Sequence, residues 1–356
     1  MEKEQAHLYD GPVMVSVCCT AYNHAKYIRH TLEGFVRQVT NFRYEVIVHD
    51  DASTDGTLAI IREYEQKYPQ LIKVIAQKEN QYSKGVKIIQ NIIFPTLQGK
   101  YLAICEGDDY WCDDHKLQKQ FDAMQAHPEC SICTHLVKCC NEDGSENAVL
   151  FPAKSYHINK TGVLTQQQLA DCYWVKSTNL PFQASSYFLR REVFTLDLEY
   201  NRDIGYLRKS LLLGSMFFFN TPMSTYRLFS SGSWTSRLKE DGAHAYYDFL
   251  MQKIREEESF DKDTQYRYHT YIEYEKCILL ITCFDYAQAE ARKRIQAENL
   301  QGVHFRTIAP LSQCIKMRTQ LMLIRYAPAL LLFMKKGKRH FQALLSSGRG
   351  LLSRQS

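Results

Sequence analysis

Three carboxylates stand within four positions at the end of an apolar run. The stretch YLAICEGDDYW covers residues 101–111, and its first acids are Glu106, Asp108 and Asp109. Carboxylates this close raise one another's pKa unless a cation neutralises them. Mg²⁺ or Mn²⁺ needs only one or two protein carboxylates, because water and substrate phosphates complete its coordination. The stretch therefore predicts a metal and phosphate site centred on Asp108; the alternative is a set of solvated acids that cap the next helix.

Strand and helix patterns alternate four times around this stretch. Apolar, β-favouring runs at residues 13–19, 44–48, 71–76 and 101–105 predict strands. Helical spacing follows each of them, at residues 24–39, from Ser53 or Asp55 onwards, at residues 85–97 and at residues 115–128. This alternation predicts a doubly wound, mostly parallel sheet with right-handed crossovers.

Polar clusters follow the carboxyl ends of three of these strands. They are TAYN at residues 20–23, HDDASTDGT at residues 49–57 and EGDD at residues 106–109. Ligands of such sheets bind beyond the carboxyl ends of the strands, so we expect the three clusters to line one crevice.

The rest of the chain divides by pattern. Residues 130–235 contain shorter strand-like pieces and predict a mixed extension of the same domain, whereas residues beyond 240 are helical in pattern. We therefore expect a leader at residues 1–12, one α/β domain at residues 13–238 and a helical, basic region at residues 239–356.

The twelve cysteines predict free thiols. Several lie inside apolar runs such as VSVCCTAY, no signal peptide precedes them, and a reducing cytoplasm is the expected compartment. The segment CSICTHLVKCC at residues 130–140 includes a CxxC and His135, which raises a zinc site. A strand explains it more simply, because a second well-spaced ligand pair is missing.

Positive charge is concentrated at the C-terminus. Residues 291–356 have 13 Lys or Arg and one acid, a net charge of +12, against −7 for the first 290 residues. The apolar run 326–334 is too short to span a bilayer, which needs about 20 residues. Two interpretations stay open for residues 310–356: peripheral contact with an anionic membrane surface, or a helix packed on the protein with a solvated basic end. We expect no nucleic-acid partner, because no nucleic-acid motif accompanies the charge.

The motifs VSVCCTAYNHAKYIRHTLEGF, VHDDASTDGT and AICEGDDYWCDDHKLQKQ resemble three successive signatures of the family 2 glycosyltransferases. The resemblance covers residues 13–235 and implies the GT-A fold, a Rossmann-like fold with a mostly parallel central sheet flanked by helices, here with a helical C-terminal extension. It also implies an inverting, metal-dependent transfer of a hexose or N-acetylhexosamine from a nucleotide sugar, UDP-sugar above others. The acceptor would be a hydroxyl of a glycan or lipid-linked glycan in bacterial surface-polysaccharide synthesis, at the cytoplasmic face of the inner membrane.

Carried over residue by residue, the resemblance assigns a nucleotide-sugar site. Glu106 stands where the family's DxD motif has its first Asp, and it would lie near the ribose; Asp108 would bind Mn²⁺ or Mg²⁺, with Asp109 sharing or supporting it. The other residues implied at the nucleotide sugar are Thr20, Tyr22, Asn23, Asp50, Asp51, Ser53 and Gly107, with Asp51 on the base.

Two downstream segments also resemble the family. In NRDIGYLRKSLLLGSMFFF, Asp203 and Gly214 match an Asp and Gly eleven residues apart, which implies that Asp203 is the general base. A carboxylate near the acceptor hydroxyl suits inversion, because proton removal accompanies attack at the anomeric carbon. In STYRLFSSGSWTSR, Arg227 and Trp234 match and would contact phosphate or sugar, while Phe229 replaces a common His.

Three other classes remain as alternatives. A sugar nucleotidyltransferase would carry a Gly-rich loop after the first strand, which TAYNHAKY lacks. A prenyl-transferring enzyme would place DDYWCDD on a helix of an all-helical protein. A catalytically degenerate GT-A scaffold subunit of a polysaccharide-assembly complex is the non-enzymatic alternative, and it predicts no nucleotide binding.

Overall fold

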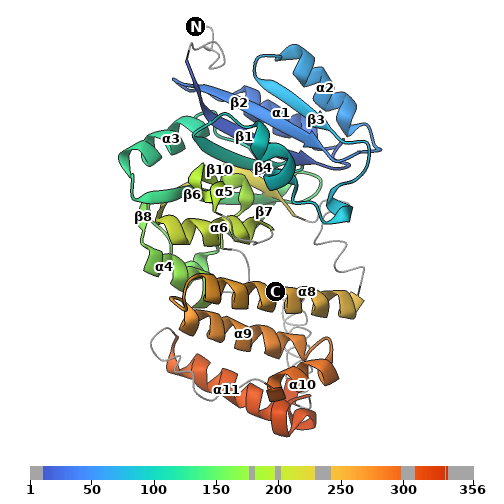
Figure 1. Ribbon diagram of the computed structural model, residues 1–356, viewed down its shortest axis with the longest axis vertical. Helices are drawn as coiled ribbons and strands as arrows, with labels where there is room; N and C mark the ends of the chain where they lie inside the picture. Colours follow the sequence, from blue (N-terminus) through green and yellow to red (C-terminus); the bar gives the residue numbers. More distant parts are fainter. Residues whose placement is uncertain are drawn as a thin grey trace, which may run out of the picture. The chain divides into compact units, whose positions relative to one another are not determined.

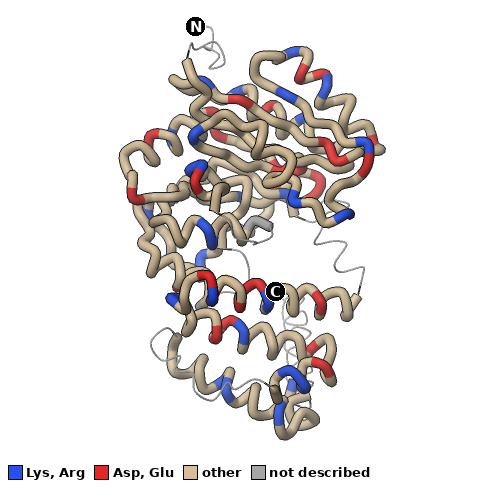
Figure 2. Tube along the Cα trace, in the orientation of Figure 1, with Lys and Arg blue, Asp and Glu red and all other residues tan. Residues whose placement is uncertain are grey.

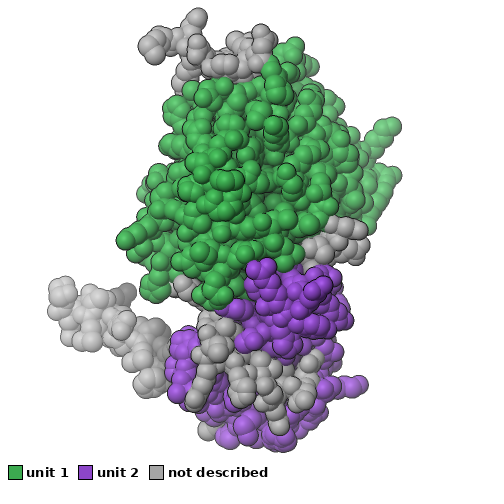
Figure 3. Space-filling view, turned by 60° about the vertical axis from the view of Figure 1, so that its left-hand side comes forward, with its two compact units in different colours: residues 1–237 green, residues 238–356 purple. Residues whose placement is uncertain are grey.

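The computed structural model describes residues 11–175, 181–196, 202–228, 242–297, 309–332 and 334–335. The chain divides into two compact units, residues 1–237 and residues 238–356, which are coloured separately in Figure 3. The first unit is an α/β unit and the second is helical (Figure 1).

Four parallel strands form the first half of the sheet, in the order β3-β2-β1-β4. Buried apolar side chains dominate β1, β2 and β4, as expected of strands covered on both faces. The bounds are β1 (Val13–Ala21), β2 (Arg43–Asp50), β3 (Ile72–Ala76) and β4 (Tyr101–Glu106), and the helices that follow β1, β2 and β4 are α1 (Ile28–Val36), α2 (Thr57–Lys67) and α3 (Lys116–Ala126). The predicted alternation is confirmed in this half.

The second half of the sheet is mixed. β9 lies antiparallel between β4 and β6, β6 pairs in parallel with β10, and β5, β7 and β8 add antiparallel edges. These strands are β5 (Tyr110–Trp111), β6 (Cys130–Cys140), β7 (Glu146–Phe151), β8 (Gly162–Leu164), β9 (Phe188–Arg190) and β10 (Ser215–Arg227). Short helices α4 (Gln166–Ala170) and α5 (Glu192–Thr195) and the longer α6 (Arg202–Leu213) connect them. All of these strands belong to one sheet, which confirms the predicted extension.

The helix expected at residues 85–97 is only partly regular. The segment at residues 85–97 is a π-helix at Ile88–Ile93 and a 3₁₀ turn at Phe94–Thr96, because the Ile run is a poor helix former and Pro95 ends regular hydrogen bonding. β10 is a single 13-residue strand. Its register against β6 shifts on both sides of Pro222, as at a β-bulge.

The second unit consists, over its described residues, of α8 (Gly242–Asp263), α9 (His269–Cys283), α10 (Gln288–Ala297) and α11 (Leu311–Tyr326), followed by helical residues 328–332 and 334–335. α9 is the central helix, because it packs against α8, α10 and α11. The predicted helical C-terminal region is confirmed. None of the described helices combines the length and the apolar character that crossing a membrane requires.

Candidate active site

Strand register brings the three polar clusters to one edge. Thr20 at the end of β1 lies opposite His49 of β2 and Glu106 of β4, and Ala21 lies opposite Asp50. Main-chain hydrogen bonds continue the pairing beyond the strands, from Asp51 N to Ala21 O at 2.9 Å and from Gly107 N to Thr20 O at 2.9 Å. The structure therefore places the clusters side by side, as the parallel pattern predicts.

The acidic loop, residues 106–109, is held tightly against β1 and α1. A Cβ atom at Gly107 would meet His24 Nδ1 at 2.8 Å and Ile28 Cδ1 at 3.0 Å, so only glycine fits without a shift. The Thr31 hydroxyl of α1 donates towards the carbonyl oxygens of Gly107, at 3.0 Å, and Asp109, at 2.6 Å. These contacts fix the main chain that carries Asp108.

The carboxylates of this loop repel one another. Asp108 is 8% exposed and Asp109 is 1% exposed. Burial, followed by the negative charges of Asp108 and Glu106, raises the pKa of Asp109 well above its ordinary value. A cation at this loop would relieve that repulsion.

Arg227, at the end of β10, fastens the loop from the other side. Its main-chain N–H donates to Asp109 Oδ1 at 3.0 Å, and its Nε donates to the carbonyl oxygen of Asp108 at 3.2 Å. Its Nη1 donates to the Glu142 carbonyl at 3.0 Å, and its guanidinium lies 4.7 Å from the centre of the Tyr27 ring. Arg227 is 6% exposed and acts here as a latch on the acidic loop; its predicted phosphate contact stays a prediction.

A buried brace is built around Trp111, which the sequence already suggests as a support of the loop; the parts of Lys116 and Gln120 were not foreseen. Trp111 Nε1 donates to the Ser185 carbonyl at 3.1 Å, and Lys116 Nζ lies 4.1 Å from the centre of the indole ring. Lys116 Nζ also donates to Gln120 Oε1 at 2.7 Å, and Gln120 Nε2 donates to the Ser186 carbonyl at 2.9 Å. Burial lowers the pKa of Lys116 to about 7. The sequence feature that could have indicated this brace is the position of Lys116 in HKLQKQ, directly before Leu117, which faces the protein interior.

The loops that follow β1 and β2 are joined to each other. Asn23, at φ 56°, donates its N–H to Ser53 Oγ at 3.0 Å and accepts at Oδ1 from Thr54 N at 2.8 Å. Ser53 N donates to Asp50 Oδ2 at 3.1 Å. Thr20 and Tyr22 are half-buried beside this junction. The positive φ is a conformation that Asn tolerates better than most residues.

Asp51 organises the loop after β3. Its carboxylate oxygens accept the main-chain N–H groups of Gln81, at 2.8 Å, and Tyr82, at 3.0 Å. Each carboxylate oxygen can accept a second hydrogen bond, so this arrangement remains compatible with the predicted contact to a base.

Two polar side chains at this edge have buried atoms that no described residue satisfies. Among the described residues, Asp50 Oδ1 and both ring nitrogens of His49 are buried without a hydrogen-bond partner. A buried polar atom left unsatisfied costs about 1–3 kcal/mol, so such atoms indicate a ligand or ordered water.

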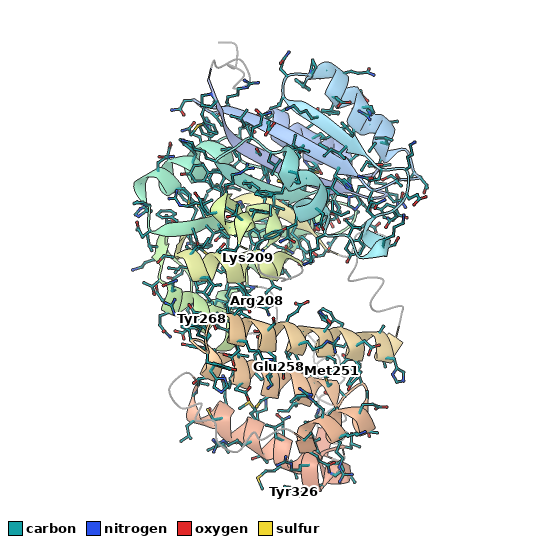
Figure 4. All side chains as sticks on the ribbon, in the orientation of Figure 1. Arg208, Lys209, Met251, Glu258, Tyr268 and Tyr326 are labelled. Carbon is teal, nitrogen blue, oxygen red and sulfur yellow. The ribbon has the colours of Figure 1, made fainter. Side chains whose placement is uncertain are left out.

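Two of the predicted site residues, Asp203 and Trp234, lie partly or wholly outside the described residues. Asp203 is in the first turn of α6, but its side chain lies outside the described residues, as does all of Trp234. The far end of α6 is fixed: a Cβ atom at Gly214 would collide with the Glu129 carbonyl, and Ser131 Oγ donates to the Ser210 carbonyl at 2.7 Å. Lys209, labelled in Figure 4, donates to the Leu196 carbonyl at 2.8 Å.

The donor set suits a divalent ion that shares its ligands with a substrate. No three His, Cys, Asp or Glu side chains in the described part of the chain are arranged to enclose a metal. Mg²⁺ and Mn²⁺ sites that use substrate phosphates need only one or two carboxylates. Asp108, which is less buried than Asp109, fits that role with Asp109 beside it.

The α/β sheet and the acidic loop define a nucleotide-sugar transferase class of fold, and comparisons with known proteins agree. Residues 16–194 match the sequence profile of glycosyl transferase family 2. The chain belongs to this family, and its fold is GT-A.

Individual relatives cover less of the chain. The Mycobacterium tuberculosis protein Rv1520, itself uncharacterized, is 44% identical over 142 residues, 40% of this chain and 40% of its own length. The Escherichia coli UDP-Glc:alpha-D-GlcNAc-diphosphoundecaprenol beta-1,3-glucosyltransferase WfaP is 29% identical over 152 residues, 43% of this chain and 49% of its own.

A solved structure shows the same fold over a longer stretch. S. aureus TarS 1–349 in complex with UDP-GlcNAc has a TM-score of 0.56 at 17% identity and covers 88% of this chain and 89% of that one.

Proposed function

We propose that this glycosyltransferase moves a sugar from a UDP-sugar to a hydroxyl of a glycan or lipid-linked glycan, with inversion at the anomeric carbon and with a divalent metal. One observation supports this most strongly: the fixed, buried acidic loop lies beside the loops of Asn23, Ser53 and Asp51 at the carboxyl edge of the sheet. TarS has been solved with UDP-GlcNAc, and WfaP is named for a UDP-glucose donor, which supports UDP as the nucleotide.

We assign the site residues to different parts of the nucleotide sugar and to the metal. Asp51 and the junction of Asn23 with Ser53 hold the base and ribose, together with Thr20, Tyr22, Asp50 and Glu106. Asp108, with Asp109, holds Mn²⁺ or Mg²⁺, which supplies positive charge for the leaving diphosphate. Gly107 lets the loop approach β1, and Arg227 keeps it in place.

Asp203 would accept the proton of the acceptor hydroxyl. As that oxygen bonds to the anomeric carbon, the bond between this carbon and the diphosphate oxygen breaks, and the nucleoside diphosphate leaves. We expect Asp203→Asn to lower turnover by about 10²–10⁴-fold. Unchanged turnover in a folded variant would remove Asp203 from this role.

The proposed acceptor suggests where in the cell the enzyme acts. WfaP is named for a lipid-diphosphate acceptor, and residues 310–356 here are basic. We place the protein at the cytoplasmic face of the inner membrane, with residues 310–356 in peripheral contact.

A panel of UDP, GDP and CMP sugars tests the proposal. We expect UDP-sugars to raise the unfolding temperature more than the others, and more so with Mn²⁺, and to be turned over to a product of inverted anomeric configuration by NMR. The degenerate scaffold predicts that no nucleotide sugar binds, and that result would overturn the proposal.

A further inference from the structure

Helix α11 has apolar side chains on two faces. Cys314, Met317, Leu321 and Ile324 are buried and face the unit's interior, where α11 packs against α9 and α10. A second set of large apolar side chains on the same helix is exposed instead: Leu311 (49%), Ile315 (56%), Met322 (62%) and Tyr326 (68%). Packing within the unit therefore explains only the first face.

The exposed set forms one stripe. Its members are separated by four, seven and four residues, and at about 100° per residue they fall within a sector of about 60°. Leu330 (51%) and Met334 (55%) are also exposed, in the helical residues that follow the break at Ala327. Figure 4 shows Tyr326 at the C-terminal end of α11, directed away from the other helices of its unit.

The stripe is a concentration of apolar surface. Among the described residues, eleven large apolar side chains are exposed; four of them form this stripe, and Leu330 and Met334 follow it in the chain. Scattered exposed apolar residues need no explanation, but a contiguous set marks an interaction surface.

Positive charge accompanies the stripe. Lys316 and Arg318 are exposed on α11, and the sequence has no acid from residue 299 to residue 356. Figure 2 shows blue but no red segments along α11. Arg325 is the inward cation: its Nη2 donates to the carbonyls of Ile295, at 3.1 Å, and Gln296, at 2.9 Å.

We infer that this stripe, Leu311, Ile315, Met322 and Tyr326, lies in the interface of an anionic lipid surface, with Lys316 and Arg318 at the headgroups. Apolar side chains flanked by cations are the pattern of an interfacial helix. A second copy fits less well, because a two-fold contact would set these cations against themselves. The inference deepens the proposed function by naming the face that meets the membrane carrying the acceptor.

Deleting the segment would be a poor test, because the deletion would also remove the buried face of α11. Substituting only the outward side chains avoids this problem. The test variant is Ile315→Gln/Met322→Gln/Tyr326→Gln in the full chain. The matched control, Val149→Gln/Tyr266→Gln/Tyr286→Gln, removes three exposed apolar side chains that lie elsewhere.

The readout is co-sedimentation with vesicles of phosphatidylcholine, with or without phosphatidylglycerol. We expect the unchanged chain and the control to bind the phosphatidylglycerol vesicles, and the stripe variant to bind about tenfold more weakly or less. Equal binding by the stripe variant, or equal binding to phosphatidylcholine alone, would overturn the inference. A dimer that the stripe variant disperses, seen by light scattering, would also overturn it in favour of a second copy.

Unfolding temperatures verify that both variants fold. UDP binding, measured without vesicles, keeps a failure of this inference distinct from a failure of the proposed function. We expect both variants to retain UDP binding, since neither changes the acidic loop.

Discussion

Each unit of the molecule buries acidic side chains, but the two units neutralise them differently. In the helical unit, Glu275 is 3% exposed and meets Lys253 Nζ at 2.6 Å, beside Glu257. In the α/β unit, Asp109 is buried with Asp108 and Glu106 nearby, and the Arg227 guanidinium donates to the main-chain carbonyls of Asp108 and Glu142.

The difference separates a structural cluster from a functional one. Lys253 offsets part of the buried charge of α8 and α9 within the protein, and the raised pKa of Glu275 lets a proton offset the rest, so that cluster needs nothing from outside. The acidic loop instead receives hydrogen bonds that fix its shape while its carboxylates still repel one another, and a repelling cluster at a strand edge favours binding of a cation. Removing charge should therefore damage the first cluster and leave the fold around the second intact.

The largest expected effect is on stability in the helical unit. Lys253→Met leaves Glu275 and Glu257 buried without this cation, and loss of one partner of a buried ion pair costs about 3–5 kcal/mol. Hydrogen exchange of α8 and α9 should accelerate accordingly. Lys262→Met, on the exposed side of α8, is the control; equal acceleration in both would mean that the pair is not what stabilises the unit.

The next effect is on activity in the α/β unit. Asp108→Asn should reduce transfer by about 10²–10³-fold, as expected when one transition-state charge interaction is lost. Its unfolding temperature should stay the same or rise, because one member of a repelling set is neutralised. Asp122→Asn, an exposed acid of α3, should leave both quantities unchanged. A destabilised Asp108→Asn would show that this cluster is structural after all.

A pH effect follows in the helical unit. Burial, then Glu257, raises the pKa of Glu275 to about 8, although Lys253 opposes the shift. The folded state therefore holds a proton that the unfolded state releases near pH 4.5. Stability is fully present below that pH and falls as the pH rises towards about 8, by a few kcal/mol at most. Chemical unfolding across this range measures the slope, and Glu275→Gln should flatten it; an unaltered slope would contradict the assignment.

The smallest expected effect is on transfer activity when Arg227, which holds the acidic loop, is changed. Arg227→Lys keeps the charge but loses the planar fork that reaches the carbonyls of Asp108 and Glu142 together. We expect transfer to fall by about tenfold, since the acidic loop is less firmly positioned. Arg37→Lys, at a largely exposed ion pair with Asp114, should have no effect. A loss as large as that of Asp108→Asn would point to direct phosphate contact by Arg227 instead.

The local pattern of the sequence predicted much of the fold. Apolar runs and helical stripes predicted the four parallel strands and the helices after β1, β2 and β4, because each pattern reports burial of its own element. The convergence of Thr20, Asp50 and Glu106 followed from the parallel topology, which places the carboxyl ends together.

Features that depend on contacts distant in sequence were not predictable in this way. Arg227 fastens a loop more than a hundred residues earlier, and the brace of Trp111 with Lys116 depends on the Ser185 carbonyl. The outward stripe of α11 was hidden for a similar reason: only packing shows which apolar face stays exposed.

Calorimetric titration of UDP with and without Mn²⁺ tests the role of the acidic loop most directly. We predict that Mn²⁺ strengthens UDP binding to the unchanged protein, and that Asp108→Asn loses this gain while retaining metal-free binding through the Asp51 side of the site. If Mn²⁺ has no effect on the unchanged protein, or strengthens binding equally in Asp108→Asn, the acidic loop does not hold the metal.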